Sequence, residues 1–138
     1  MDIQSAEDPA MGSNDQIELA HRLTKSLEDG DVEAVRSAFC PDAVLWHNTD
    51  GLTLDLDGLA GSFSSFVADV PKRHIDVHER LNIAGSLFQS HTINCATHDG
   101  RAFKLRGCWM LKFERGKIIR LDEYLDGSAF PSALSTED

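Results

Sequence analysis

Three stretches of the chain carry apolar residues at the three- and four-residue intervals that are typical of helices. These stretches are residues 13–29, 31–39 and 57–70. The residues that start them are Ser13, in capping-box spacing with Gln16, then Asp31 and Asp57. The residues that stop them are Gly30, Pro41 and Pro71. The pattern therefore predicts three helices.

Most of the remaining chain alternates between apolar and polar positions, as strands do. The strand-like stretches are residues 43–48, 52–57, 74–83, 86–97, 101–113 and 117–125. Turn signals separate several of them, at Asp50-Gly51, Asp99-Gly100 and Arg115-Gly116. This order of elements predicts an α+β fold, in which a curved antiparallel sheet wraps around the helices as a cone-shaped α+β barrel with an internal pocket.

Length and charge narrow the class of protein. For a chain of 138 residues we expect a flexible leader at residues 1–12, a single domain at 13–130 and a tail at 131–138. The formal net charge of -10 argues against a nucleic-acid or anionic membrane partner. The sequence shows no signal-peptide pattern and no apolar run of membrane-spanning length, and its cysteines lack paired spacing. We therefore expect a cytoplasmic protein with reduced thiols.

Two segments give the chain a resemblance to a known family. They are residues 27–48, LEDGDVEAVRSAFCPDAVLWHN, and residues 116–126, GKIIRLDEYLD. Together with the order of elements, they resemble the nuclear transport factor 2-like superfamily, and within it the SnoaL-like polyketide cyclases, whose relatives include ketosteroid isomerase and limonene-epoxide hydrolase. The similarity covers about Asp15 to Phe130 and implies the same fold. Because one such fold hosts many reactions, the function depends on the site.

Glu123 is the exception on an otherwise apolar face of the last strand, since successive side chains of a strand point to opposite sides. We expect it to project into a pocket whose wall is apolar. The predicted wall residues are Leu105, Trp109, Leu121 and Leu125. Desolvation there would raise the pKa of Glu123 and suit it to proton transfer near neutral pH. Alternatively, Glu123 pairs with Arg106 or Arg120, or reaches solvent past the strand edge. A register shift by one residue would exchange it with Asp122 or Tyr124.

His47 is the second candidate catalytic residue. The resemblance implies this role, because His47 falls where ketosteroid isomerases carry their aspartate base when residues are counted from Gly30 and Asp31. Imidazole can transfer the same proton, since its pKa lies near neutrality. A histidine hydrogen-bonded within a strand or at a dimer seam is the structural alternative. Asn48 belongs to the pocket instead if the strand bulges.

The chain departs from its relatives at other positions. Ketosteroid isomerases hold the enolate oxygen with a tyrosine and a protonated acid, and the matching positions here are Leu23 and Trp109. Limonene-epoxide hydrolases use an aspartate, arginine and aspartate triad. An ungapped count places Glu123 at its last-strand aspartate, but Ser90 and Thr92 at the other two positions. The SnoaL-like cyclases, which place a carboxylate in an apolar pocket, resemble the chain better.

Polar residues on a neighbouring strand complete the predicted pocket. We expect Ser90, Thr92 and Asn94 to face inward, where they hold a substrate carbonyl or a water, or satisfy one another. Phe130 is expected to cap the pocket mouth, and His91 is expected to point outward into solvent. No metal site is predicted, because the spacing of His74 and His78 would suit two zinc ligands only on a helix, and their segment alternates like a strand.

Two functions of different classes follow. The first is an acid/base enzyme without a cofactor, in which Glu123 and His47 act on a small apolar, carbonyl-bearing substrate of polyketide or steroid type. Its reaction is an isomerisation, cyclisation, elimination or hydrolysis, with epoxide hydrolase-like water addition as a further alternative. The second is a non-catalytic module that binds an apolar ligand or a protein. Either one is expected to form a homodimer through the mixed outer face of the sheet.

Overall fold

The computed structural model describes residues 11–126 and residue 128. This part of the chain forms helices and strands in the order that the sequence pattern predicts. The helices are α2 (Ser13–Asp29), α3 (Val32–Ser37) and α4 (Leu56–Asp69). The strands are β1 (Phe39–His47), β2 (Thr53–Leu54), β3 (Lys72–Ile83), β4 (Ser86–Ala96), β5 (Ala102–Glu114) and β6 (Lys117–Leu125). No helix in this part combines the length and the apolar character needed to cross a membrane.

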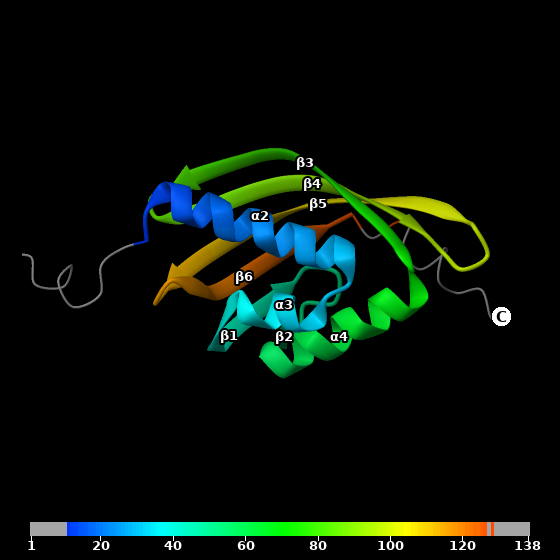
Figure 1. Cartoon of the computed structure of the whole chain (residues 1–138), viewed down its shortest axis with the longest axis horizontal. Coiled ribbons are helices and arrows are strands. Elements are labelled where there is room, and N and C mark those ends of the chain that lie inside the picture. Colours follow the sequence, from blue (N-terminus) through cyan, green and yellow to red (C-terminus); the bar gives the residue numbers. More distant parts are fainter. Residues whose placement is uncertain (1–10, 127, 129–138) are drawn as a thin grey trace, which may run out of the picture.

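The strands form one sheet in the order β2-β1-β6-β5-β4-β3. Strands β3 to β6 make an antiparallel meander, while β1 lies parallel to β6 and pairs with β2 on its other side. The long strands curve, and the three helices lie on one side of the sheet (Figure 1). The predicted α+β fold is confirmed. In the described part of the chain the sheet stays open, with β2 and β3 as its edges.

Two helices are capped by residues other than the predicted ones. Gly12, and not Ser13, is the N-cap of α2, and no side chain caps this end. Helix α4 starts earlier than predicted because Asp55 caps it, with its carboxylate accepting a hydrogen bond of 2.8 Å from the N–H of Gly58. The predicted cap, Asp57, lies instead in the first turn, where a negative charge also favours a helix N-terminus.

Helix α3 is capped by Asp31 as predicted, but it ends at Ser37. Phe39, which the helical spacing placed on this helix, begins β1 instead and pairs with Ile118 of β6. Its ring still enters the core, but from a strand. Apolar spacing alone cannot separate the last turn of a short helix from the first residue of the strand that follows.

An irregularity in β3 reverses which of its side chains face the helices. The register shifts between Val77 and Glu79, so that one extra residue enters the strand. Beyond this point the apolar side chains of Leu81 and Ile83 turn to solvent and are 43% and 51% exposed. Strict alternation, which the sequence suggested for the whole strand, holds only for its first half.

A second irregularity lies at the start of β6. The register shifts before Arg120, and as a result Ile118 is fully buried at 0% exposure, where alternation predicted Ile119 to face inward. The later residues Leu121 and Glu123 keep the inward direction that alternation predicted. The shift therefore comes early enough to leave the predicted site on the correct face.

The core consists of two apolar clusters on the concave side of the sheet. The larger one joins α2 and α3 to the middle of the sheet, with Leu23, Leu45 and Leu111 among its most buried members. Met11, at the end of the predicted leader, packs against it. The smaller cluster gathers around Val70 at the end of α4. Leu27 and Phe66 pack against both clusters and connect them.

Gly107 lets β5 and β6 approach each other closely beside the site. A Cβ atom at this position would lie 2.3 Å from the backbone oxygen of Tyr124 and 2.7 Å from Cδ2 of Leu125. Both atoms belong to the strand that carries Glu123, so a side chain at Gly107 would push that strand away.

We predict that Gly107→Ala lowers the free energy of unfolding by about 1–3 kcal/mol, because the new methyl group overlaps backbone atoms that cannot rotate away. Urea denaturation measures the loss. Gly61→Ala is the matched control, since nothing lies within 4 Å of a Cβ there and Gly61 is within helix α4. It should raise stability by up to about 1 kcal/mol. Equal stability of the two variants would contradict the close approach.

Candidate active site

A cavity of about 430 Å³ lies between the concave face of the sheet and the helices. Most of its wall is apolar, with Leu23 and Leu27 from α2 and Phe63 and Phe66 from α4. The four predicted wall residues, Leu105, Trp109, Leu121 and Leu125, all line it. A mostly apolar space of this size fits a small organic ligand.

Glu123 and His47 lie side by side on the cavity wall. They are direct partners in the parallel pairing of β1 with β6, so both side chains leave the sheet on the same face. His47 Nε2 is 3.4 Å from Glu123 Oε1, and the two side chains are only 16% and 19% exposed. On the other side, Trp109 pairs with Glu123 and its Nε1 donates to Glu123 Oε2 at 3.4 Å. The two predicted catalytic residues are therefore in contact.

Burial raises the pKa of the Glu123 carboxyl above its usual value, because the cavity removes the water that would solvate the negative charge. The positive charge of His47, when it is protonated, and the hydrogen bond from Trp109 act in the opposite direction. A carboxyl with a raised pKa is a stronger base when ionised and remains available as an acid closer to neutral pH. Glu123 thus has the environment of a proton-transfer group.

The predicted polar residues of β4 do not face the cavity. Ser90, Thr92 and Asn94 alternate with the buried, inward-pointing residues of this strand and belong to the outer face. Thr92 Oγ1 is 2.8 Å from Nε2 of His78, and Asn94 Nδ2 donates to Asp76 at 2.9 Å. The inward direction that the ungapped count suggested for these three residues is therefore wrong, since in a strand a displacement of one residue reverses the face.

Asn48 also lies outside the cavity. It is exposed, and its side-chain amide is paired with the backbone of Leu125, accepting from the N–H at 2.8 Å and donating to the carbonyl at 3.2 Å. Its own N–H donates to the carbonyl of Glu123 at 3.0 Å. Asn48 therefore holds the end of β1 against β6, next to Glu123 and His47. Phe130 lies outside the described residues.

His91 is buried, contrary to the expectation that it points to solvent. It is 1% exposed on the inward face of β4, and its ring centroid lies 4.7 Å from that of Trp109 at an interplanar angle of 65°. Nε2 of Gln89 lies 3.1 Å from Nδ1 of His91. Because an amide nitrogen only donates, Nδ1 accepts and the ring proton is assigned to Nε2. No hydrogen-bond partner of Nε2 is present among the described residues.

Gln89 and His91 belong to a buried polar cluster that the sequence reasoning missed. Gln89 Nε2 also donates to Thr24 Oγ1 of α2 at 3.2 Å, and Arg80 Nε donates to Gln89 Oε1 at 2.7 Å. Strand alternation could have revealed it, because Gln89 and His91 lie two and four residues after Leu87 and therefore share the face of that buried residue. Within the described residues, no group of three or more His, Cys, Asp or Glu side chains is arranged to hold a metal ion.

Comparison with models of known protein families assigns the chain to one of them. The model of the SnoaL-like domain family matches residues 20–121, a stretch that includes α3 and α4 and extends from α2 into β6. The chain therefore belongs to the SnoaL-like family, whose fold is NTF2-like. A search of curated proteins finds no match.

Solved structures share the fold at low sequence identity. An NTF2-like protein of unknown function from Burkholderia pseudomallei is 16% identical, with a TM-score of 0.76 over 91% of this chain and 100% of the other. TerC, crystallised with polyporic acid, is 18% identical with a TM-score of 0.76 over 88% and 99%. A hypothetical protein with a ketosteroid isomerase-like fold from Catenulispora acidiphila, crystallised with trimethylamine, is 12% identical with a TM-score of 0.75 over 86% and 92%.

The burial of His91 leads to a prediction about acid stability. Burial, with smaller contributions from the charges of His78 and Arg80, lowers the pKa of His91 from 6.5 to about 4. Between these pH values the unfolded chain binds the proton and the folded chain does not, so stability falls as the pH drops through this window. The loss from this group is roughly 2 kcal/mol between pH 7 and pH 5.

We predict that His91→Leu removes this part of the pH dependence, so that urea unfolding at pH 7 and pH 5 gives a smaller difference than in the wild type. His21→Leu is the control, because His21 is exposed on α2 and should leave the difference unchanged. An unaltered pH dependence in His91→Leu would show that His91 is not held neutral by the fold.

Proposed function

We propose that the protein is a cofactor-independent enzyme that transfers a proton on a small apolar substrate with a carbonyl group, of polyketide or steroid type. The observation that carries the proposal is the contact between Glu123 and His47 at 3.4 Å on the wall of an apolar cavity. Solved structures with this fold support a small-molecule role, since one was crystallised with polyporic acid and another with trimethylamine.

In the proposed reaction, the ionised Glu123 carboxylate takes a proton from the carbon next to the substrate carbonyl. The electron pair of the broken C–H bond moves into the carbonyl and forms an enolate. Protonated His47 then gives its proton to the enolate oxygen or to another carbon of the substrate. Trp109 fixes the orientation of the carboxylate through its hydrogen bond to Oε2. The apolar wall excludes water, which strengthens the attraction between the charges that develop.

Proton transfer fits this site better than the alternatives. Epoxide opening needs groups that aim a water molecule, and Ser90 and Thr92, which the resemblance placed in that role, face away from the cavity. A non-catalytic pocket would be favoured by an arginine paired with Glu123, whereas the described partners of its carboxylate are His47 and Trp109.

We also place the protein in the cytoplasm, a location that its free cysteines support.

We predict that Glu123→Gln lowers enzyme-catalysed deuterium exchange at the α-carbon of 2-tetralone by about 100-fold or more, because the amide cannot accept the proton. Proton NMR in D2O measures the exchange. His47→Ala should lower it as well. Asp122→Asn is the matched control, since Asp122 is the preceding residue, pairs with Arg120 and belongs to the opposite face of β6. Wild-type exchange in both Glu123→Gln and His47→Ala would contradict the proposal.

A homodimer through the outer sheet face is part of the proposal. On this face Tyr124 is 47% exposed and packs edge to face on Trp46, with ring centroids 5.3 Å apart. We predict a dimer in sedimentation at micromolar concentration, and a monomer for Tyr124→Glu, because a charge would be buried without a partner. Leu52→Glu is the control, since Leu52 is equally accessible but outside the long strands. A monomeric wild type would contradict the dimer.

A further inference from the structure

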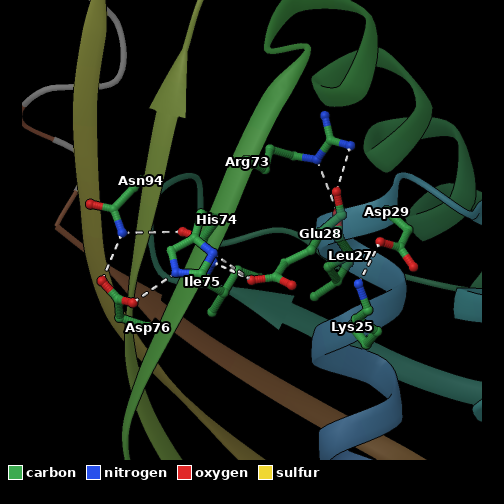
Figure 2. A network of polar contacts seen from close by, with 9 residues as sticks. All are labelled: Lys25, Leu27, Glu28, Asp29, Arg73, His74, Ile75, Asp76 and Asn94. Carbon is green, nitrogen blue, oxygen red and sulfur yellow. Dashed lines mark hydrogen bonds and ion pairs between the residues drawn. The ribbon is translucent and has the colours of Figure 1, made fainter.

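Arg73 places a guanidinium group on the wall of the same cavity. It stands near the start of β3 and is half-buried. Three of its N–H groups donate to backbone carbonyls: Nε to Leu27 at 2.9 Å, Nη2 to Glu28 at 3.0 Å, and Nη1 to Val70. Figure 2 shows the bonds from Nε and Nη2 to the end of α2. These bonds fix the group in place.

The positive charge of Arg73 has no carboxylate in contact with it among the described residues. Its three acceptors are neutral carbonyls at the ends of α2 and α4. The nearby acids are engaged elsewhere: the Glu28 carboxylate accepts from the N–H of Ile75 at 2.7 Å, and Asp29 pairs with Lys25 at 3.0 Å (Figure 2). Helix dipoles offset part of the charge, but a full negative charge is missing.

The guanidinium also has donors to spare. An arginine carries five N–H groups, so the three bonds leave two, one on each Nη nitrogen. Among the described residues that line the cavity, Arg73 is the only lysine or arginine. The acids Asp50 and Asp69 also line the cavity, but both are exposed, so water screens their charges.

Arg73 and the catalytic pair belong to different parts of the cavity. Strands β4 and β5 lie between β3 and β6, and the two sites also differ in position along the strands. In the sheet, Arg73 pairs with Cys95, which in turn pairs with Phe103. Glu123 pairs with Trp109, which lies further along β5. The wall between the two sites is apolar, with Leu105 and Ile93 as examples.

We infer that Arg73 is an anion-binding subsite, which selects elongated apolar substrates with a carboxylate or a similarly acidic oxygen remote from the reacting carbonyl. Planar carboxylates match the fork of a guanidinium, and such charge-assisted hydrogen bonds are about twice as strong as neutral ones. The subsite would hold the acidic end of the ligand while the carbonyl end meets Glu123 and His47. The inference rests on the proposed function only where it places the substrate carbonyl at Glu123 and His47.

The test compares two probes of matched shape, 6-acetyl-2-naphthoate and the neutral 6-acetyl-2-naphthamide, by isothermal titration calorimetry on the full chain. The wild type should bind the carboxylate about tenfold more tightly or better, since a charge-assisted pair replaces a neutral contact. Arg73→Gln should abolish this preference. Glu123→Gln should keep it, because Glu123 belongs to the other part of the cavity.

Arg80→Gln is the matched control. Arg80 is a half-buried arginine of the same strand and also donates to neutral groups, Oε1 of Gln89 at 2.7 Å and Oγ1 of Thr24 at 3.3 Å. It does not line the cavity, so its loss should leave the preference for the carboxylate intact. If Arg73→Gln does not fold, Arg73→Lys keeps a charge without the fork and should show a reduced preference.

Equal affinity of the wild type for both probes, or no binding of either at millimolar concentration, would overturn the subsite. So would a preference that persists in Arg73→Gln. If the preference is absent while deuterium exchange still depends on Glu123, the subsite fails and the proposed function stands. If the preference depends on Arg73 but exchange does not depend on Glu123, the subsite stands and the proposed function fails.

Discussion

The parallel pairing of β1 with β6 is the constraint on which the site depends. It places His47 directly beside Glu123 on one face of the sheet, and Asn48 fastens the end of this pairing to the backbone of Leu125. A buried carboxylate without partners would cost several kcal/mol in a real protein. His47 and Trp109 offset part of that cost, because both stabilise the ionised form of the carboxylate. The contacts that make the carboxylate tolerable in the fold are therefore also the ones that act on its pKa.

The position of Glu123 could be predicted from the sequence because strand alternation holds locally. The irregularity in β6 comes before Arg120, so the count along Leu121, Glu123 and Leu125 stays in phase. The same rule failed in β3, where a bulge turned Leu81 and Ile83 outward. A bulge adds one residue to a strand and leaves no clear signal in the sequence. Periodicity therefore predicts the presence of a strand more reliably than the face on which each residue lies.

The hydrogen-bond partners of the buried polar cluster of Gln89 and His91 could not be predicted, for a different reason. Gln89 and His91 lie on the inward face of β4, where Gln89 donates to Thr24 of α2, accepts from Arg80 of β3 and lies beside Nδ1 of His91. Nothing local in β4 identifies these partners, and Ser90 and Thr92 have equally polar side chains. In this cluster the ring of His91 packs against Trp109, and Trp109 in turn donates a hydrogen bond to Glu123. Packing behind the cavity wall thus supports the Trp109 side chain that donates to the Glu123 carboxylate.

The end of α2 links the fold to the charge of Arg73. Gly30 ends this helix in the left-handed conformation, with φ of 72°, which favours glycine on backbone grounds alone. A Cβ at this position would also lie 2.7 Å from Nη2 of Arg73, so the glycine leaves room for the guanidinium against the last carbonyls of the helix. One residue therefore ends the helix and admits the cation. The cavity thus has the proposed acid/base pair in one part and a fixed positive charge in another, and this asymmetry would orient a ligand before any proton moves.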